Sequence, residues 1–381
     1  MRVAVYTDQR YWRTADGTVH TARAFVGFLG EVARHVDDLV LVGRLDERPG
    51  SPAEPVPAGV RFAALPHYED AADPRALARA FSGSLRRFWR LLEHVDVVWV
   101  LGPYPLAVAF AVAARLRRRK VVLGVRQDLP AYIRARRPGR RGALAAALAL
   151  EAVWRALARG ASVVVVGPGL ARNYRAAKRV LPIFVSLVHD ADVAALPAAR
   201  AEGGERRLLA VGRLDPEKNP LLLADVLARL NADAPRWRLV VCGDGALREA
   251  LAARLAETGQ AEHAELRGHV PAGAGLWKLY RDSDAFLHVA LTEGFPQVLL
   301  EAFAAALPVV ATDVGGVREG AGAAAELVPA ADAGAAVAAL ERLAADEPRR
   351  RARVEAGLEL ARRHTAGAEA ARVAAFLIAR S

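Results

Sequence analysis

The stretch HVALTEGFPQVLLEAFAAALPVVATDVGG, residues 288–316, decides the fold, because it holds a strand, a loop, a helix and a second strand in turn. An apolar strand ends at the polar TEG loop, a helix is expected over 297–306, and PVVAT follows as the next strand. Such units build parallel sheets, which bind ligands beyond the carboxyl ends of their strands. Two carboxylates, Glu293 and Glu301, stand in this otherwise apolar stretch where a ligand is expected.

The same alternation of strands and helices runs through both halves of the chain and predicts two doubly wound α/β domains. It lapses over residues 190–207, an Ala-, Gly- and Pro-bearing stretch that we interpret as the connection between domains. Strands are expected at 2–8, 38–44, 95–102, 120–125, 161–167, 208–213, 238–243, 264–268, 285–291 and 308–312. Helices are expected at 22–36, 75–93, 105–118, 142–159, 220–231, 246–258, 273–281 and 297–306.

Length and composition limit the class of protein. The 381 residues suit two domains, and 53% hydrophobic with 25% charged residues exclude a disordered chain. The single cysteine, Cys242, excludes an intramolecular disulfide, so a reducing cytoplasm is expected. The first residues, MRVAVYTDQR, reach Asp8 too early for a signal peptide, and no apolar run approaches the roughly 20 residues of a membrane span.

Positive charge is concentrated in the first half of the chain. Residues 1–190 hold 30 Lys and Arg against 16 Asp and Glu, whereas the remainder holds 23 against 26. Eleven cations and one anion fall within 115–141. A phosphate-bearing partner, either an anionic membrane surface or an acidic acceptor, would complement this segment, and a solvated face is the alternative interpretation.

Two cations follow the first strand of the second domain in the loop VGRLDPEKNP. Arg213 stands just past the strand, and Lys218 follows between two prolines. Arginine can grip a phosphate as a fork and lysine as a point charge, although two solvated surface charges would produce the same pattern. The next strand ends in VVCGDG, where Gly243 and Gly245 allow close approach of a ligand or form a structural tight turn.

The helix start inside the opening stretch predicts an anion site. Pro296 suits the first helical position, which leaves the amides of Gln297, Val298 and Leu299 without intrahelical partners. Glu293, in the preceding loop, is placed to accept hydrogen bonds from ligand hydroxyls. Glu301 lies inside the helix among apolar neighbours and needs donors, for which a ribose diol is the sharper candidate and an internal salt bridge or a solvent-facing position the alternative.

The sequence Asp282-Ser283-Asp284 matches a D-x-D pattern by which many sugar transferases hold a divalent metal. It precedes the strand expected at 285–291 and therefore lies at the amino end of that strand. We interpret it as turn chemistry and expect no metal site there.

Together, the segments 211–220, 240–245, 266–270 and 291–316 resemble the donor half of retaining glycosyltransferases of family 4, the group 1 glycosyltransferases. The resemblance is specific over about residues 208–320 and rests on architecture elsewhere. It implies the α/β fold named GT-B, two Rossmann-like doubly wound parallel-sheet domains facing across a cleft. The expected bounds are 1–195 for the acceptor-binding domain and 205–362 for the donor-binding domain, with a last helix, 363–381, that can pack back on the first domain.

The resemblance also implies site roles. Arg213 and Lys218 resemble the pair that contacts the donor diphosphate, Glu293 the first glutamate of an E-x7-E motif, and Glu301 its second, ribose-binding glutamate. Arg213, Lys218 and Glu293 are the catalytic candidates. The donor-binding candidates are Gly17, Gly243, Gly245, Gly294, Phe295, Gln297, Val298 and Glu301.

The first domain departs from the family pattern. The usual Gly-Gly loop after its first strand is replaced by TADGTVHT, with Gly17 alone. The histidine common after a central strand is replaced by Arg126-Gln127-Asp128. Arg126, Asp128 and His20 are candidates for the acceptor or sugar pocket, and a helix start or surface position is the alternative for His20.

The function implied is retaining transfer of a sugar from a UDP- or GDP-sugar to a hydroxyl of a glycan, a lipid-linked sugar or a small molecule, without metal or cofactor. The expected location is the cytoplasm, with peripheral contact to an anionic membrane as a further expectation. A nucleotide-sugar epimerase or phosphorylase of the same fold is one alternative. A non-catalytic protein that binds nucleic acid or membrane through its basic half is the other, although no nucleic-acid partner is expected.

Overall fold

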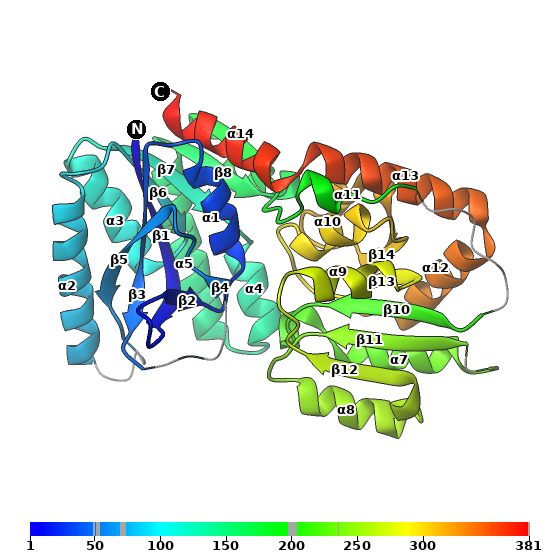
Figure 1. The fold of residues 1–381 in the computed structure, drawn as a ribbon. Coiled ribbons are helices and arrows are strands. Elements are labelled where there is room, and N and C mark those ends of the chain that lie inside the picture. The colour runs from blue at the N-terminus through cyan, green and yellow to red at the C-terminus, as the bar shows by residue number, and fades with distance from the viewer. Residues whose placement is uncertain (49, 51–53, 69–73, 197–203, 235, 380–381) are drawn as a thin grey trace. The chain divides into compact units, whose positions relative to one another are not determined.

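The computed structural model describes residues 1–48, 50, 54–68, 74–196, 204–234 and 236–379 (Figure 1). The chain divides into two compact units. The first unit contains residues 1–130, 141–185 and 366–381. The second contains residues 131–140 and 186–365. The chain therefore leaves the first unit after residue 185, ahead of the expected connection at 190–207, of which residues 197–203 lie outside the described part.

The first unit is built on a nine-stranded sheet that is parallel except at its β2 and β4 edge. The order is β4-β2-β1-β6-β7-β8-β9, and β3 pairs with both β1 and β5. The strands are β1 (Arg2–Arg13), β2 (Val19–Thr21), β3 (Asp38–Asp46), β4 (Glu54–Pro55), β5 (Val60–Pro66), β6 (Val97–Gly102), β7 (Lys120–Val125), β8 (Ser162–Val166) and β9 (Arg179–Ile183).

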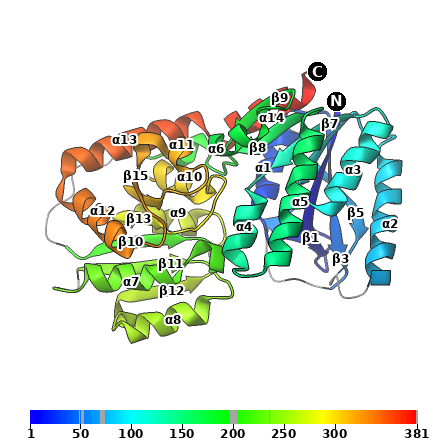
Figure 2. The same cartoon turned by 180° about the vertical axis from the view of Figure 1, so that it is seen from behind.

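Helices cover both faces of this sheet, which explains why its central strands are apolar without alternation. Helices α2, α3 and α5 lie on one face (Figure 2). On that face Tyr6 packs edge-on against Phe110, which in turn stacks on Phe88. On the other, α1 packs against the last helix, α14. The helices of the unit are α1 (Phe25–Ala33), α2 (Pro74–Leu91), α3 (Pro105–Leu116), α5 (Arg141–Ala158), α6 (Pro168–Ala171), η1 (Arg172–Tyr174) and α14 (Ala366–Ile378).

The second unit has a six-stranded, wholly parallel sheet in the order β12-β11-β10-β13-β14-β15. From β10 the chain first adds strands in one direction and then returns to add β13, β14 and β15 in the other. The point where the direction reverses lies between β10 and β13. The strands are β10 (Arg206–Val211), β11 (Trp237–Cys242), β12 (Ala264–Gly268), β13 (Ala285–His288), β14 (Val309–Thr312) and β15 (Ala325–Val328).

Helices also cover both faces of the second sheet. Alternate strand residues, such as Leu208 and Leu239, pack with α7 and α12 in one apolar cluster, while Phe286 contacts Tyr280 of α9. The helices are α7 (Leu221–Leu230), α8 (Arg248–Glu257), α9 (Ala274–Arg281), α10 (Gln297–Ala304), α11 (Val317–Ala321), α12 (Ala333–Ala345) and α13 (Glu347–Arg363). Short 3-10 turns are η2 (Asp190–Asp192), η3 (Pro216–Lys218), η4 (Ala261–His263) and η5 (Gly322–Ala324). The remaining helix, α4 (Leu129–Arg136), starts in the first unit and ends in the second.

The two doubly wound α/β units confirm the predicted fold class. The elements that were not predicted include the strands β2, β4, β5, β9 and β15 and the helices α4, α6 and α11. The first strand was expected to end at residue 8, and this end is wrong, because β1 continues to Arg13 and forms a hairpin with β2. Tyr11 and Trp12 are buried there, which explains the extension. Across the described helices, none combines the length and the apolar character that a bilayer-spanning helix requires.

A buried carboxylate attaches the last helix to the first unit. Glu369 of α14 is fully buried, and its Oε2 accepts a hydrogen bond of 3.1 Å from the Phe184 amide, just after β9. Its Oε1 accepts from the Arg372 guanidinium at 2.5 Å. The Arg372 guanidinium also donates to the Pro182 carbonyl at 3.0 Å. The helix is therefore held by a charged network as well as by apolar packing.

We expect Glu369→Ala to lower the free energy of unfolding by about 3 kcal/mol, because the buried Phe184 amide and Arg372 lose this acceptor. Urea unfolding of the full chain measures the change. The matched control is Glu359→Ala on α13, which removes an exposed pair with Arg363 and should cost less than about 0.5 kcal/mol. Equal losses for the two variants would contradict the role given to Glu369.

Candidate active site

The loops after β10 and β13 lie side by side at the point where the strand order of the second unit reverses. In doubly wound sheets this is the position where ligands bind. The β10 loop carries Arg213 and Lys218, and the β13 loop carries Glu293. A hydrogen bond of 2.9 Å from the Leu291 amide to the Glu217 carbonyl ties the two loops together. The topology thus brings together the three residues predicted from the sequence to be catalytic.

Lys218 and Glu293 form an ion pair between these loops. The same carboxylate oxygen, Oε1, lies 3.2 Å from Nε2 of His288, the last residue of β13. Burial raises the pKa of Glu293, but the Lys218 ammonium and the His288 hydrogen bond outweigh it and lower the pKa to about 2. Glu293 is therefore an acceptor of hydrogen bonds at neutral pH and carries no proton to donate.

Arg213 is also paired with carboxylates. Its guanidinium donates to Asp215 and, at 2.7 Å, to Glu217. Both carboxylates are buried, and Glu217 is only 1% exposed. Arg136, which reaches this place from the segment 131–140, donates to Asp215 at 3.2 Å and to Glu217 at 3.0 Å. Two arginines thus share two carboxylates, so the positive charges of Arg136 and Arg213 are balanced by the negative charges of Asp215 and Glu217.

Close backbone contacts explain two predicted glycines, Gly243 and Gly245. A Cβ on Gly243 would lie 1.8 Å from the Gly212 carbonyl oxygen, so only glycine fits beside the β10 loop. Gly245 is similarly close to the Leu214 backbone, at 2.7 Å. A hydrogen bond of 2.9 Å from the Leu214 amide to the Asp244 carbonyl holds the two loops in register. The glycines place the β11 loop against the residues on either side of Arg213.

A second close contact supports the Glu293 loop. Gly315 has a φ of +56°, and a Cβ there would lie 1.8 Å from the Glu293 carbonyl oxygen. The Gly316 amide donates to the Gly294 carbonyl at 3.0 Å. The Gly-Gly pair after β14 therefore fixes the backbone of Glu293, a role that the sequence analysis did not assign to it.

The start of α10 differs from the prediction. Pro296 is the N-cap and the helix begins at Gln297, because the ψ of 127° at Pro296 is extended. The Leu299 amide donates to the Pro296 carbonyl at 3.2 Å, so the prediction that it is free is wrong. The first two helical residues are Gln297 and Val298, and within the described residues the Gln297 Nε2 is buried without a partner. Gly294 and Phe295 are buried in the preceding loop.

Glu301 faces a donor within the second unit. The Tyr280 hydroxyl, on α9, donates to Glu301 Oε2 at 2.7 Å. Burial raises the pKa of Glu301, the Tyr280 hydrogen bond opposes this, and the charge of Asp192 adds to the rise. The donor to the Glu301 carboxylate is thus a tyrosine hydroxyl. Among the described residues no cation pairs with Glu301, so the internal salt bridge considered from the sequence is not found.

The candidate residues of the first unit lie in two places, the β1–β2 hairpin and the loop after β7. Gly17 occupies the turn between β1 and β2, where its amide donates to the Thr14 carbonyl at 2.9 Å, so this turn uses the amide that was expected to face a diphosphate. His20 lies within β2. Arg126 follows the carboxyl end of β7, with its guanidinium 4.8 Å from the centre of the Phe25 ring, and Asp128 follows two residues later.

The D-x-D sequence has structural partners. Asp282 pairs with Lys278 at 2.7 Å, and Asp284 accepts from the Arg207 amide at 2.7 Å at the amino end of the sheet. Sequence reasoning missed other residues that the geometry brings to the switch point. They are Arg136, Asp215, Glu217, Tyr280, His288 and Gly315. The acidic residues of LDPEK were a usable signal, because carboxylates beside two cations suggest ion pairs.

Most of the second unit is similar in sequence to known glycosyltransferases. Residues 192–359, less than half of the chain, match the family described as Glycosyl transferases group 1. A Campylobacter jejuni N-acetylgalactosaminyltransferase acting on a diphospho-undecaprenol substrate is 35% identical over 109 residues, 29% of this chain and 28% of that protein. A GDP-mannose-dependent alpha-mannosyltransferase of Mycolicibacterium smegmatis is 39% identical over 112 residues, 29% of this chain and 26% of that protein. The chain thus matches about a quarter of the length of these relatives.

Solved structures show the fold over nearly the whole chain. Sucrose-phosphate synthase from Thermosynechococcus elongatus superposes with a TM-score of 0.73 at 18% identity, covering 99% of this chain and 98% of that one. WaaG, a glycosyltransferase involved in lipopolysaccharide biosynthesis, gives 0.72 at 16% identity, covering 99% and 100%. Anabaena HepE in complex with UDP gives 0.70 at 15% identity, covering 99% of each chain. The architecture is that of GT-B glycosyltransferases.

We expect Gly315→Ala to destabilise the protein by at least about 2 kcal/mol more than Gly259→Ala, at the end of α8. Both glycines have a positive φ, +56° and +70°, so both variants incur backbone strain. Of the two, only Gly315 would bring a Cβ against backbone, whereas no atom lies within 4 Å of one at Gly259. Urea unfolding compares the two, and equal losses would contradict the role of Gly315 in fixing Glu293.

Proposed function

We propose that this protein is a retaining glycosyltransferase that moves a sugar from a nucleoside-diphosphate sugar to an acceptor hydroxyl. The observation that carries the proposal is the pair of cations, Arg213 and Lys218, at the switch point of a unit that matches the group 1 glycosyltransferases. Carboxylates hold both cations in place before any ligand binds. Both side chains offer N–H donors to the oxygens of a nucleotide diphosphate.

The donor would lie along the second unit. Its diphosphate would contact Arg213, Lys218 and the first amides of α10, and its sugar hydroxyls would donate to Glu293. Glu301 would accept from the ribose, sharing its carboxylate with the Tyr280 hydroxyl. The buried Gln297 amide group, which lacks a partner among the described residues, would gain one from the donor. Gly243, Gly245, Gly294, Phe295 and Val298 would contribute through their backbone.

The chemical step would rest on charge stabilisation. Departure of the nucleoside diphosphate develops negative charge on its phosphate, and Arg213 with Lys218 would stabilise that charge, as preorganised donors do. Two such cations supply the stabilisation that a divalent metal gives in other transferases, so we propose a metal-independent reaction without cofactor. The pKa of Glu293, about 2, suits a hydroxyl acceptor and does not suit a general acid. Transfer with retention follows from the family resemblance.

The acceptor would bind to the first unit. Arg126 and Asp128 follow the carboxyl end of β7, and His20 lies in β2, so these residues remain candidates for the acceptor or sugar pocket. The donor would be a UDP- or GDP-sugar, and the acceptor a glycan, a lipid-linked sugar or a small molecule. We propose a reducing cytoplasmic location, since the single cysteine is buried and unpaired, with peripheral contact to an anionic membrane.

Two other functions make different predictions. An epimerase or phosphorylase of the same fold would turn over a nucleotide sugar or glycan without an acceptor alcohol. A non-catalytic protein would bind nucleic acid or vesicles through its basic half, independently of Lys218 and with steep salt dependence. The carboxylate-held cations and the family that the second unit matches favour transfer.

We expect Lys218→Gln to reduce turnover of the matching nucleotide sugar by roughly a hundredfold or more, because one of two charges that stabilise the leaving group is lost. A panel of UDP- and GDP-sugars with diverse acceptor alcohols identifies the substrate, and NMR of the product reads its anomeric configuration. The matched control is Lys278→Gln, which removes an exposed lysine that pairs with Asp282.

Lys278→Gln should keep wild-type turnover. Glu301→Ala should weaken donor binding without changing the anomeric outcome. Full donor affinity in Glu301→Ala would contradict the ribose assignment, and turnover without any acceptor would contradict transfer in favour of the epimerase or phosphorylase.

A further inference from the structure

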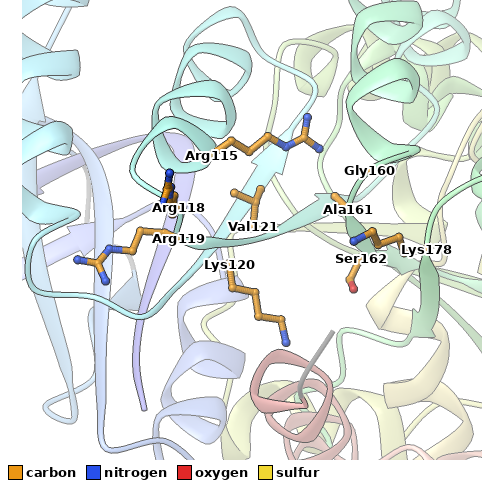
Figure 3. A pocket seen from close by; sticks show the side chains of 9 residues that line it. All are labelled: Arg115, Arg118, Arg119, Lys120, Val121, Gly160, Ala161, Ser162 and Lys178. Carbon is orange, nitrogen blue, oxygen red and sulfur yellow. The ribbon is translucent and has the colours of Figure 1, made fainter.

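A cavity of about 360 Å³ opens at the amino ends of β7 and β8 in the first unit (Figure 3). Its polar lining consists of Arg115, Arg118, Arg119, Lys120, Ser162 and Lys178. Its volume lies in the range of small-ligand sites, about 300–1,000 Å³. The cavity is therefore large enough for a compact anion with an attached group.

The cavity lies far from the proposed transfer site of its own unit. Lys120 is the first residue of β7, and Arg126 follows the carboxyl end of the strand after six residues, a rise of roughly 20 Å at about 3.3 Å per residue. Doubly wound sheets bind substrates at the carboxyl edge. A ligand in this cavity would therefore occupy a second site.

Within the part of the chain that the structure describes, no carboxylate pairs with the positive charge of the cavity. Among the described residues, no Asp or Glu forms an ion pair with any of its five cations. Arg115 donates to the Leu157 carbonyl, and Lys120 donates to the carbonyls of Leu377 and Ala379, so these partners are neutral. Burial lowers the pKa of Lys120, and the nearby positive charge of Arg179 lowers it further.

One cation on the rim of the cavity has a strained backbone. Arg118 adopts a φ of +54°, a left-handed conformation that glycine or asparagine takes more readily at the end of a helix. The chain thus keeps a long cationic side chain on the rim of the cavity at the expense of backbone strain.

The distribution of lysines along the chain also supports an anion site in this cavity. The whole chain has four lysines against a background of arginine, and two of them, Lys120 and Lys178, line this cavity. A third, Lys218, is at the proposed diphosphate site. Ammonium point charges together with guanidinium forks are the groups that bind phosphate oxygens.

We propose that this cavity is a second anion site, which binds a phosphate group through Arg118 and Lys178. The phosphate belongs either to a free phosphorylated compound or to a phospholipid head group, and both present the same oxygens. The site does not depend on the transferase activity, since none of its residues contributes to the proposed donor site.

The test measures binding of inorganic phosphate by isothermal titration at constant ionic strength, with chloride as the competing background. Arg118→Gly and Lys178→Gln should each weaken phosphate binding roughly tenfold or more, since each removes a charged hydrogen-bond donor. Arg118→Gly relieves the positive φ, so its melting temperature should equal or exceed that of the wild type, which separates binding from folding.

Two controls have the opposite expectation. Arg90→Gln removes an exposed positive charge from α2, outside the cavity, and should leave phosphate binding unchanged. Lys218→Gln alters the donor site and should also leave binding at this cavity unchanged. If Arg118→Gly and Lys178→Gln bind phosphate as the wild type does, or if Arg90→Gln loses as much, the proposal is overturned.

A second arm distinguishes the source of the phosphate. Sedimentation with phosphatidylcholine vesicles that contain phosphatidic acid, in the same variants, tests the phospholipid. Vesicle binding that Arg118→Gly and Lys178→Gln weaken supports a lipid head group, and free-phosphate binding alone supports a soluble compound. Binding of neither probe by the wild type overturns the proposal.

Discussion

The ion pair between Lys218 and Glu293 joins the two loops at the switch point, and the rest of the site depends on it. Lys218 follows β10 and Glu293 follows β13, which are neighbours in the sheet although about 75 residues separate them in sequence. The pair therefore exists only once the second sheet has formed. A glycine, Gly315, must then lie under Glu293, because no side chain fits there.

Charge balance explains why an apolar stretch retains two glutamates. Glu293 has a cation and a histidine as partners, so its pKa is low. Among the described residues Glu301 has only the Tyr280 hydroxyl as a hydrogen-bond donor, and burial raises its pKa. A buried carboxylate with few donors lowers stability and favours a ligand that supplies more of them. The two glutamates therefore differ in environment although they are only eight residues apart in the second unit. They suit the two ends of one ligand better than an acid and a base.

The sequence predicts the fold from the periodic spacing of its apolar residues, which can be read without knowledge of tertiary contacts. The strand expected at 264–268 is β12 in full, and the helix expected at 273–281 agrees with α9 within a residue. Short strands such as β15, AELV, carry too little pattern to be recognised. Arg136 was interpreted as part of a basic segment, because nothing local indicates that it pairs with two buried carboxylates some eighty residues away.

The most direct test of the central claim, that Arg213 and Lys218 bind a donor diphosphate, compares nucleosides with their diphosphates. Affinities for UDP and uridine, and for GDP and guanosine, are measured in the wild type and in Lys218→Gln. The account predicts that the wild type strongly prefers one diphosphate over its nucleoside, and that Lys218→Gln loses roughly tenfold or more for that diphosphate only. An unchanged preference in Lys218→Gln, or equal losses for nucleoside and diphosphate, would contradict it.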